Sequence, residues 1–124
     1  MKVFKTRHFN KWASKEGLVG TDLLHAVEEI TRGLVEAHLG AYLYKKRIGL
    51  SGTGKRGGAR TLLAYQSGGC CIFIYGFAKA ERGNISQAEL KALKRYAREL
   101  VSYNDKALNR AVQAGALIEV NYHE

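Results

Sequence analysis

The spacing of apolar residues changes once along this chain, and that change sets the class of fold. Between residues 21 and 34 apolar side chains recur every three or four positions, which predicts an amphipathic helix capped by Thr21. After Gly40 the interval becomes two, so residues 41–48 (AYLYKKRI) indicate a strand whose successive side chains point to opposite faces. Helices followed by consecutive strands favour an α+β fold, with the helices to the side of an antiparallel sheet.

Local signals place elements on either side of that change. Residues 2–5 (KVFK) indicate an opening strand, and Thr6 can cap a short helix directly after it. The turn residues SGG at 67–69 join residues 60–65 to residues 70–77, and both segments are rich in strand-forming residues. We therefore predict a β-hairpin there.

The C-terminal third contains the clearest helix start. Ser86 and Glu89 form a capping box, which opens a long amphipathic helix. A short helix is expected around residues 108–114, and residues 116–120 fit either a closing strand or an arm.

The chain has no proline and no linker-like tract, so we expect one domain over residues 1–124. Residues 105–124 would form its C-terminal helix and tail. The complete expectation is a small, twisted antiparallel sheet with two N-terminal helices and one long C-terminal helix packed on it.

Basic residues exceed acidic ones and are unevenly placed. Lys and Arg number 20 against 11 Asp and Glu, which gives a net charge of +9 at pH 7. No carboxylate lies between Glu36 and Glu81, and the basic residues of that interval are Lys45, Lys46, Arg47, Lys55, Arg56, Arg60 and Lys79. A long stretch of one sign suits contact with phosphates, so it predicts a surface for a polyanion, most of all RNA. The alternative is a positive charge that serves solubility alone.

Several site classes lack support in the sequence. Cys70 and Cys71 are adjacent, so on a strand they point to opposite faces and fit a buried, reduced pair. The four histidines have no zinc-like spacing, and we expect neither a metal nor a cofactor. The first residues do not resemble a signal peptide, and no apolar run approaches the roughly 20 residues that span a bilayer. These features predict a cytoplasmic protein.

The segment 49–56 (GLSGTGKR) nearly matches a phosphate-binding P-loop. Arg56 stands where a Ser or Thr should hold magnesium, and the segment leads into a predicted strand instead of a helix. The overlapping G-x-G-x-x-G pattern at residues 52–57 fails as a dinucleotide-binding motif, because it too lacks the following helix. Glycines can still expose backbone N–H groups to an anion, with Lys55 adding charge, although a plain flexible loop also fits.

Four segments in order resemble the RelE/HigB-type toxins of bacterial type II toxin–antitoxin modules. They are KKR at 45–47, GKRGGAR at 54–60, YGFAK at 75–79 and NISQAEL at 84–90. The resemblance covers nearly the whole chain and is closest to the HigB-like branch of the RelE/ParE superfamily.

The resemblance implies an endoribonuclease that cuts mRNA on the translating ribosome without metal, restrained by a cognate antitoxin of the helix-turn-helix type. The positions that match the family pattern are Lys45, Arg47, Lys55, Arg60 and Lys79. The C-terminus departs from the pattern, because none of the available Tyr96, Tyr103, Tyr122 and His123 falls in a motif that aligns. The general acid and base therefore stay open.

RNA cleavage through the 2′-OH needs a base, cations that offset the charge of the transition state, and an acid for the leaving 5′ oxygen. The catalytic candidates are Lys45, Arg47, Arg60 and Lys79. The RNA-binding candidates are Lys46, Lys55 and Arg56. Within this set Arg60 is expected to hold the scissile phosphate, with Lys45 or Lys79 transferring protons.

Three other functions fit the same residues. The protein can be a non-catalytic nucleic-acid-binding or regulatory protein, or a module whose basic groove binds an acidic partner. It can also be a toxin of the same fold with another target, such as DNA gyrase, because fold does not fix function.

Overall fold

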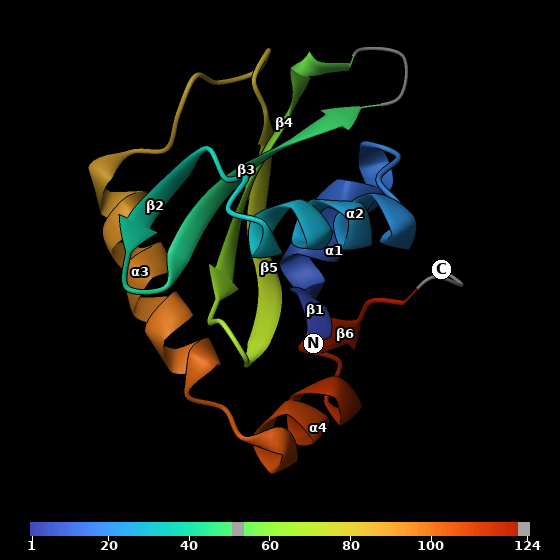
Figure 1. Ribbon diagram of the computed structural model, residues 1–124, viewed down its shortest axis with the longest axis vertical. Coiled ribbons are helices and arrows are strands. Elements are labelled where there is room, and N and C mark those ends of the chain that lie inside the picture. The colour runs from blue at the N-terminus through green and yellow to red at the C-terminus, as the bar shows by residue number, and fades with distance from the viewer. Residues whose placement is uncertain (51–53, 122–124) are drawn as a thin grey trace.

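The computed structural model describes residues 1–50 and 54–121, with side chains described outside residues 50 and 54–57 (Figure 1). The elements in chain order are β1 (Lys2–Thr6), α1 (Arg7–Lys15), α2 (Gly20–Thr31), β2 (Ala37–Gly40), β3 (Leu43–Leu50), β4 (Gly54–Tyr65), β5 (Cys70–Ala78), α3 (Gln87–Val101), α4 (Asp105–Gln113) and β6 (Leu117–Glu119). The strands form one sheet in the order β2-β3-β4-β5-β1-β6. The α+β prediction is confirmed.

The sheet is mixed, so the prediction of a purely antiparallel sheet is wrong. Strands β2 to β5 pair as antiparallel neighbours, but β1 runs parallel to β5, with Lys2 opposite Cys70. β6 then pairs antiparallel with β1 and closes that edge, which makes it a strand and not a free arm. Turn residues reveal only pairing between neighbours in sequence, and they carry no signal for a strand that inserts between two distant segments.

The helices differ from expectation in their arrangement and bounds. Two precede β2 and two follow β5, and the short helix expected around residues 108–114 is α4, which shares one face of the sheet with α3. α2 begins after Val19, whose N–H donates to the Asp22 carboxylate (2.9 Å), and not after Thr21. It ends at Thr31, which leaves Leu34 outside the helix and 52% exposed.

One strand is added to the predicted set and two are longer than predicted. β2 was not predicted, since its four residues (AHLG) are too few to show alternation. β3 and β4 run into the glycine-rich segment expected to be a connection, and Leu50 pairs with Gly54 across it. A glycine-rich segment can still form strands here, because the ladder pairs the backbone N–H and C=O groups and this pairing does not depend on side chains.

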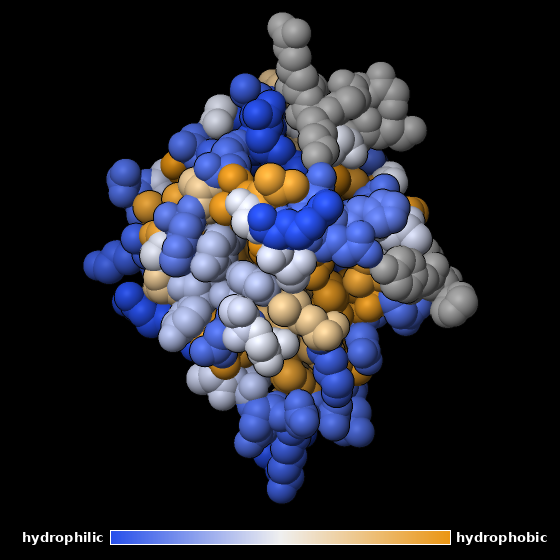
Figure 2. Space-filling view, in the orientation of Figure 1, coloured by the Kyte–Doolittle hydropathy of each residue, from blue (hydrophilic) through white to orange (hydrophobic). Residues whose placement is uncertain are grey.

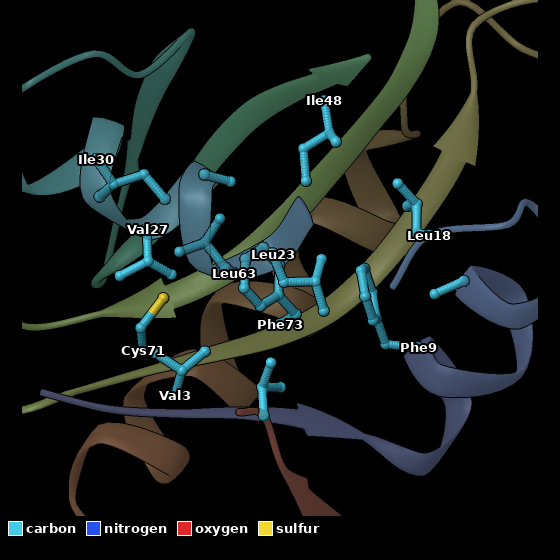
Figure 3. Packing of buried hydrophobic residues seen from close by; sticks show 13 residues of the cluster. Val3, Phe9, Leu18, Leu23, Val27, Ile30, Ile48, Leu63, Cys71 and Phe73 are labelled. Atoms are coloured by element: carbon cyan, nitrogen blue, oxygen red, sulfur yellow. The ribbon is translucent and has the colours of Figure 1, made fainter. Parts of the chain in front are cut away.

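Apolar side chains cover both faces of the sheet. On one face, Phe9 of α1 and Leu23 of α2 pack with Leu63 and Phe73 (Figure 3). On the other face, Leu100 of α3 and Leu108 of α4 pack against side chains of the same strands. The adjacent cysteines divide between the two clusters, as alternation predicts, and both are free and buried. Burial raises the pKa of the Cys71 thiol, so this sulfur is held in its unreactive form.

A glycine allows α1 to approach the sheet. A Cβ on Gly76 would lie 2.3 Å from Cζ3 of Trp12, so only glycine leaves room for the indole ring. The ring in turn packs with Phe9 in the cluster beneath α1.

We predict that Gly76→Ala lowers the free energy of unfolding by about 1–3 kcal/mol, because the ring or strand must shift to admit the methyl group. The measurement is urea unfolding followed by tryptophan fluorescence. Gly83→Ala is the matched control, since nothing lies within 4 Å of a Cβ at that position. Equal unfolding midpoints for the two variants would contradict this account of the α1 contact.

Candidate functional site

The strand register brings three of the predicted catalytic cations to one face of the sheet. Arg47 of β3 lies opposite Arg60 of β4, and Lys45 lies opposite Leu62 one step along the same face. Directly opposite residues in an antiparallel pair project to the same side. That side is the one covered by α3, because Leu62 belongs to the cluster beneath that helix.

A β-bulge in β5 adds two aromatic rings to this face. The pairing shifts between Leu62 and Leu63, which lie opposite Tyr75 and Phe73, so Ile74 is the extra residue of β5. The bulge reverses which side the following residues face, and Tyr75 joins the α3-side cluster along with Phe77. Without it, these rings would point toward α1.

Arg82 completes the group, and sequence reasoning missed it. Its Nη1 donates to the Tyr75 hydroxyl (3.3 Å), and its guanidinium carbon lies 5.7 Å from the centre of the Phe77 ring. Both terminal nitrogens donate to Glu89, at 2.9 and 2.6 Å. Glu89 also accepts from the N–H of Ser86, so the capping box of α3 is the anchor of this arginine. We call Lys45, Arg47, Arg60 and Arg82 the cationic cluster.

Arg60 is the most constrained member of the cationic cluster. It is only 5% exposed, and its Nε forms an ion pair with Oε1 of Glu36 at 2.8 Å. Its Nη1 is buried with no hydrogen-bond partner among the described residues, and the same holds for Nε of Arg47 across the ladder. An unmade hydrogen bond of a buried group costs roughly 1–3 kcal/mol, and more when the group is charged. Two such groups on opposed arginines form a site that an oxyanion would satisfy.

The sequence interval without carboxylates therefore does contact a carboxylate in the folded chain. Glu36 directly precedes β2, and its carboxylate contacts two cations. One oxygen pairs with Arg60, and Nζ of Lys45 lies 3.6 Å from the other oxygen. Lys45 also donates to Asn84 (3.3 Å), which precedes α3. The Glu36 carboxylate occupies the place between Lys45 and Arg60 that a phosphate would seek.

Lys46 lies apart from these residues. Its side chain points to the face of α1 and α2, where it is 5% exposed. Nζ donates to the carbonyl of Leu34 (2.7 Å) and pairs with Glu29 (2.8 Å). The ammonium thus ties the end of α2 to β3, and the structure does not bring it to the cationic cluster.

The remaining predicted residues have different surroundings. Lys79 is exposed directly after β5, where its backbone N–H donates to Gly58 (3.4 Å). Lys55 and Arg56 belong to β4 and not to a loop, but their side chains lie outside the described part of the chain. Among the open candidates for acid and base, burial raises the pKa of Tyr96, while residues 122–124 are not described.

The described ranges 1–50 and 54–121 contain neither a metal-binding cluster nor a membrane-spanning helix. No group of three or more His, Cys, Asp or Glu there lies close enough to hold a metal ion. No helix in these ranges is both long and apolar enough to cross a bilayer.

The contact between Arg82 and Glu89 predicts a pH dependence. Hydrogen bonds, first from the Arg82 guanidinium and then from Ser86, lower the pKa of Glu89 from 4.5 to about 2. A carboxylate whose pKa falls on folding stabilises the protein above its unfolded pKa, and that contribution is lost as the pH falls through the folded value. We expect Glu89→Gln to lower the urea midpoint at pH 7, with the difference from the parent shrinking between pH 4.5 and pH 2.

The Arg82→Gln background is the control for that series, because the contact is already absent there. The effect of Glu89→Gln should then be clearly smaller at pH 7. An effect of the same size in both backgrounds would show that Arg82 does not stabilise the carboxylate.

Comparison with known protein families gives a match over nearly the entire chain. The family model described as the RelE toxin of the RelE/RelB toxin–antitoxin system matches residues 1–120, which is nearly the entire chain. No curated protein matches the sequence closely enough to count as a relative. The extent of the family match shows that this chain belongs to the RelE toxin family of toxin–antitoxin systems.

Proposed function

We propose that this protein is the toxin of a type II module and acts as a metal-independent endoribonuclease on mRNA bound to the ribosome. The observation that carries the proposal is Arg60, a nearly buried arginine set opposite Arg47 in the ladder, whose Nη1 has no acceptor in the part of the chain that the structure describes. Membership of the RelE family and the basic net charge support it. The motif order of the sequence further favours the HigB-like branch.

The chemistry follows from how these groups are placed. The scissile phosphate would bind the free N–H groups of Arg47 and Arg60, which then face the charge that develops on the phosphorane-like transition state. Binding there would displace Glu36, because its carboxylate shares Arg60 and Lys45. Lys45 brings an amine to that face beside Glu36 and is the proposed proton-transfer group, with exposed Lys79 as the other candidate.

Arg82 has a positioning role in this proposal. Its bonds to Glu89 and Tyr75 hold a fixed positive charge beside the ring of Phe77, which lies directly opposite Arg60 in the ladder. A charge that is already oriented costs no reorganisation when the phosphate becomes more negative. The Tyr75 ring lies on the same face and can stack on a base.

The family also implies an antitoxin partner, and we propose one of the helix-turn-helix type that acts in the cytoplasm. A protein with nine excess positive charges suits a partner with an acidic segment. Such a segment can bind the same cations that RNA would contact, which explains restraint of the toxin by occupation of its site.

We predict that Arg60→Ala abolishes growth arrest on induction and lowers mRNA cleavage by about 100-fold or more, the usual loss when an oxyanion donor is removed. Arg60→Lys should recover little, because a lysine keeps the charge but not the fork of N–H groups. The measurements are growth after induction and primer extension on a reporter transcript.

Controls separate loss of function from loss of fold. Thermal unfolding of each variant checks the fold, and Lys11→Ala on the exposed side of α1 should remain as toxic as the parent. Undiminished toxicity of a folded Arg60→Ala protein would refute the catalytic site. Growth arrest by the parent without mRNA fragments would instead favour another target, such as DNA gyrase.

A further inference from the structure

The turn between β2 and β3 holds two residues in an unusual conformation. Ala41 has φ 55° and Tyr42 has φ 65°, directly after Gly40 at φ 91°. A two-residue hairpin turn of this type normally carries Asn-Gly, because side chains with a Cβ are strained at positive φ. Ala41 and Tyr42 are also the only non-glycine residues with positive φ in the described ranges, 1–50 and 54–121.

Packing does not explain why a tyrosine occupies this position. Tyr42 is 43% exposed, and it belongs to neither hydrophobic cluster of the sheet. Its carbonyl accepts from the N–H of Tyr65, a contact that any residue would make through its backbone. Strain that the fold does not require points to a function of the side chain it presents.

One flank of α3 beside this turn is basic and free of acidic residues. At 100° per residue, Lys91, Lys94 and Arg98 lie within an arc of about 60°, whereas Glu89 and Glu99 fall outside it. The turn reaches this flank, because a Cβ on Gly40 would lie 3.6 Å from Nζ of Lys94 (Figure 1). Hydrophilic side chains project along this edge of the molecule (Figure 2).

These cations have no other role in the described part of the chain. Arg82 forms an ion pair with Glu89, and Lys45 forms one with Glu36. Among the described residues, no ion pair or hydrogen bond engages the side chains of Lys91, Lys94 or Arg98. The sequence alone left this side of the helix as either a solvated face or a contact for nucleic acid. The adjacent strained tyrosine favours the contact.

We propose that Tyr42 and the three cations form a second RNA-binding surface, on which one unpaired base stacks on the tyrosine ring and neighbouring phosphates meet Lys94, Lys91 and Arg98. The identity of the ligand as RNA rests on the proposed function. Tyr42 directly precedes β3 and lies three positions before Lys45, so at most about 10 Å of chain separates them at 3.3 Å per residue. A single strand can therefore follow β3 and α3 from the cationic cluster to the turn.

The chemistry favours single-stranded RNA over the alternatives. Stacking on an aromatic ring requires an exposed base face, which a duplex does not offer. Binding of an acidic protein segment through the same cations is the other outcome that the experiment must distinguish.

The first test is binding of a fluorescent, single-stranded 2′-O-methyl oligoribonucleotide, which cannot be cut through its 2′ position, followed by anisotropy. Tyr42→Leu should weaken binding about 5- to 100-fold, the usual effect of losing one stacked base. Tyr42→Phe keeps the ring and should bind within about twofold of the parent. Equal affinity of the Leu and Phe variants would overturn the proposal.

The second test uses the strain itself. Ala41→Asn combined with Tyr42→Gly installs the preferred turn, so the melting temperature should rise by about 3 °C or more while the affinity for RNA falls as in Tyr42→Leu. Greater stability with undiminished RNA affinity would show that the tyrosine is not part of the site. This variant also removes the concern that weak binding reflects poor folding.

The third test uses salt. Lys94→Gln and Arg98→Gln should each reduce the slope of log affinity against log salt by about 0.7, and Lys15→Gln on α1 should not. If these slopes do not change while Arg60→Ala still abolishes toxicity, this surface is refuted and the proposed function stands. If Arg60→Ala stays toxic while Tyr42→Leu still loses RNA affinity, the proposed function fails and the surface stands.

Discussion

The register between β3 and β4 places two arginines directly opposite each other, and the site depends on that pairing. Arg47 and Arg60 are a like-charged cross-strand pair, which on its own destabilises a sheet. Glu36 relieves part of the repulsion through its ion pair with Nε of Arg60, but Nη1 of Arg60 and Nε of Arg47 stay buried without an acceptor among the described residues. The fold thus holds two positive charges side by side, which favours binding of an anion. The hydrophobic clusters on both sheet faces offset the destabilisation that these charges cause.

Two local devices extend this arrangement. The bulge at Ile74 turns Tyr75 and Phe77 toward the arginines, and the Ser86–Glu89 capping box fixes Arg82 over them. The same glutamate therefore starts α3 and orients a cation, which couples the position of the helix to the geometry of the site. The strained turn at Ala41 and Tyr42 lies at the far end of β3, so strand and helix together connect the two surfaces.

Much of the fold followed from local signals, and the failures share one cause. The caps at Thr6 and Ser86 and the hairpin between β4 and β5 were found because their signals lie within a few residues. The parallel pairing of β1 with β5 was missed because it joins segments far apart in sequence.

The site residues were likewise predicted where the signal is local and missed where it depends on distant contacts. Alternation correctly placed Lys45 and Arg47 on one face and Lys46 on the other, because side-chain parity is a local property. It could not show that Lys46 would be buried against Glu29, or that Glu36 would return to Arg60. Arg82 was missed because its importance comes from Tyr75 and Glu89, contacts that exist only in the folded chain.

The central claim is that the cationic cluster promotes attack of a 2′-OH on the adjacent phosphate. The most direct measurement is the chemistry of the RNA ends produced in cells after induction, read by sequencing libraries that select each type of terminus. The account predicts fragments with 2′,3′-cyclic phosphate and 5′-hydroxyl ends that are absent with Arg60→Ala. Fragments with 3′-hydroxyl and 5′-phosphate ends, or growth arrest with intact mRNA, would contradict it.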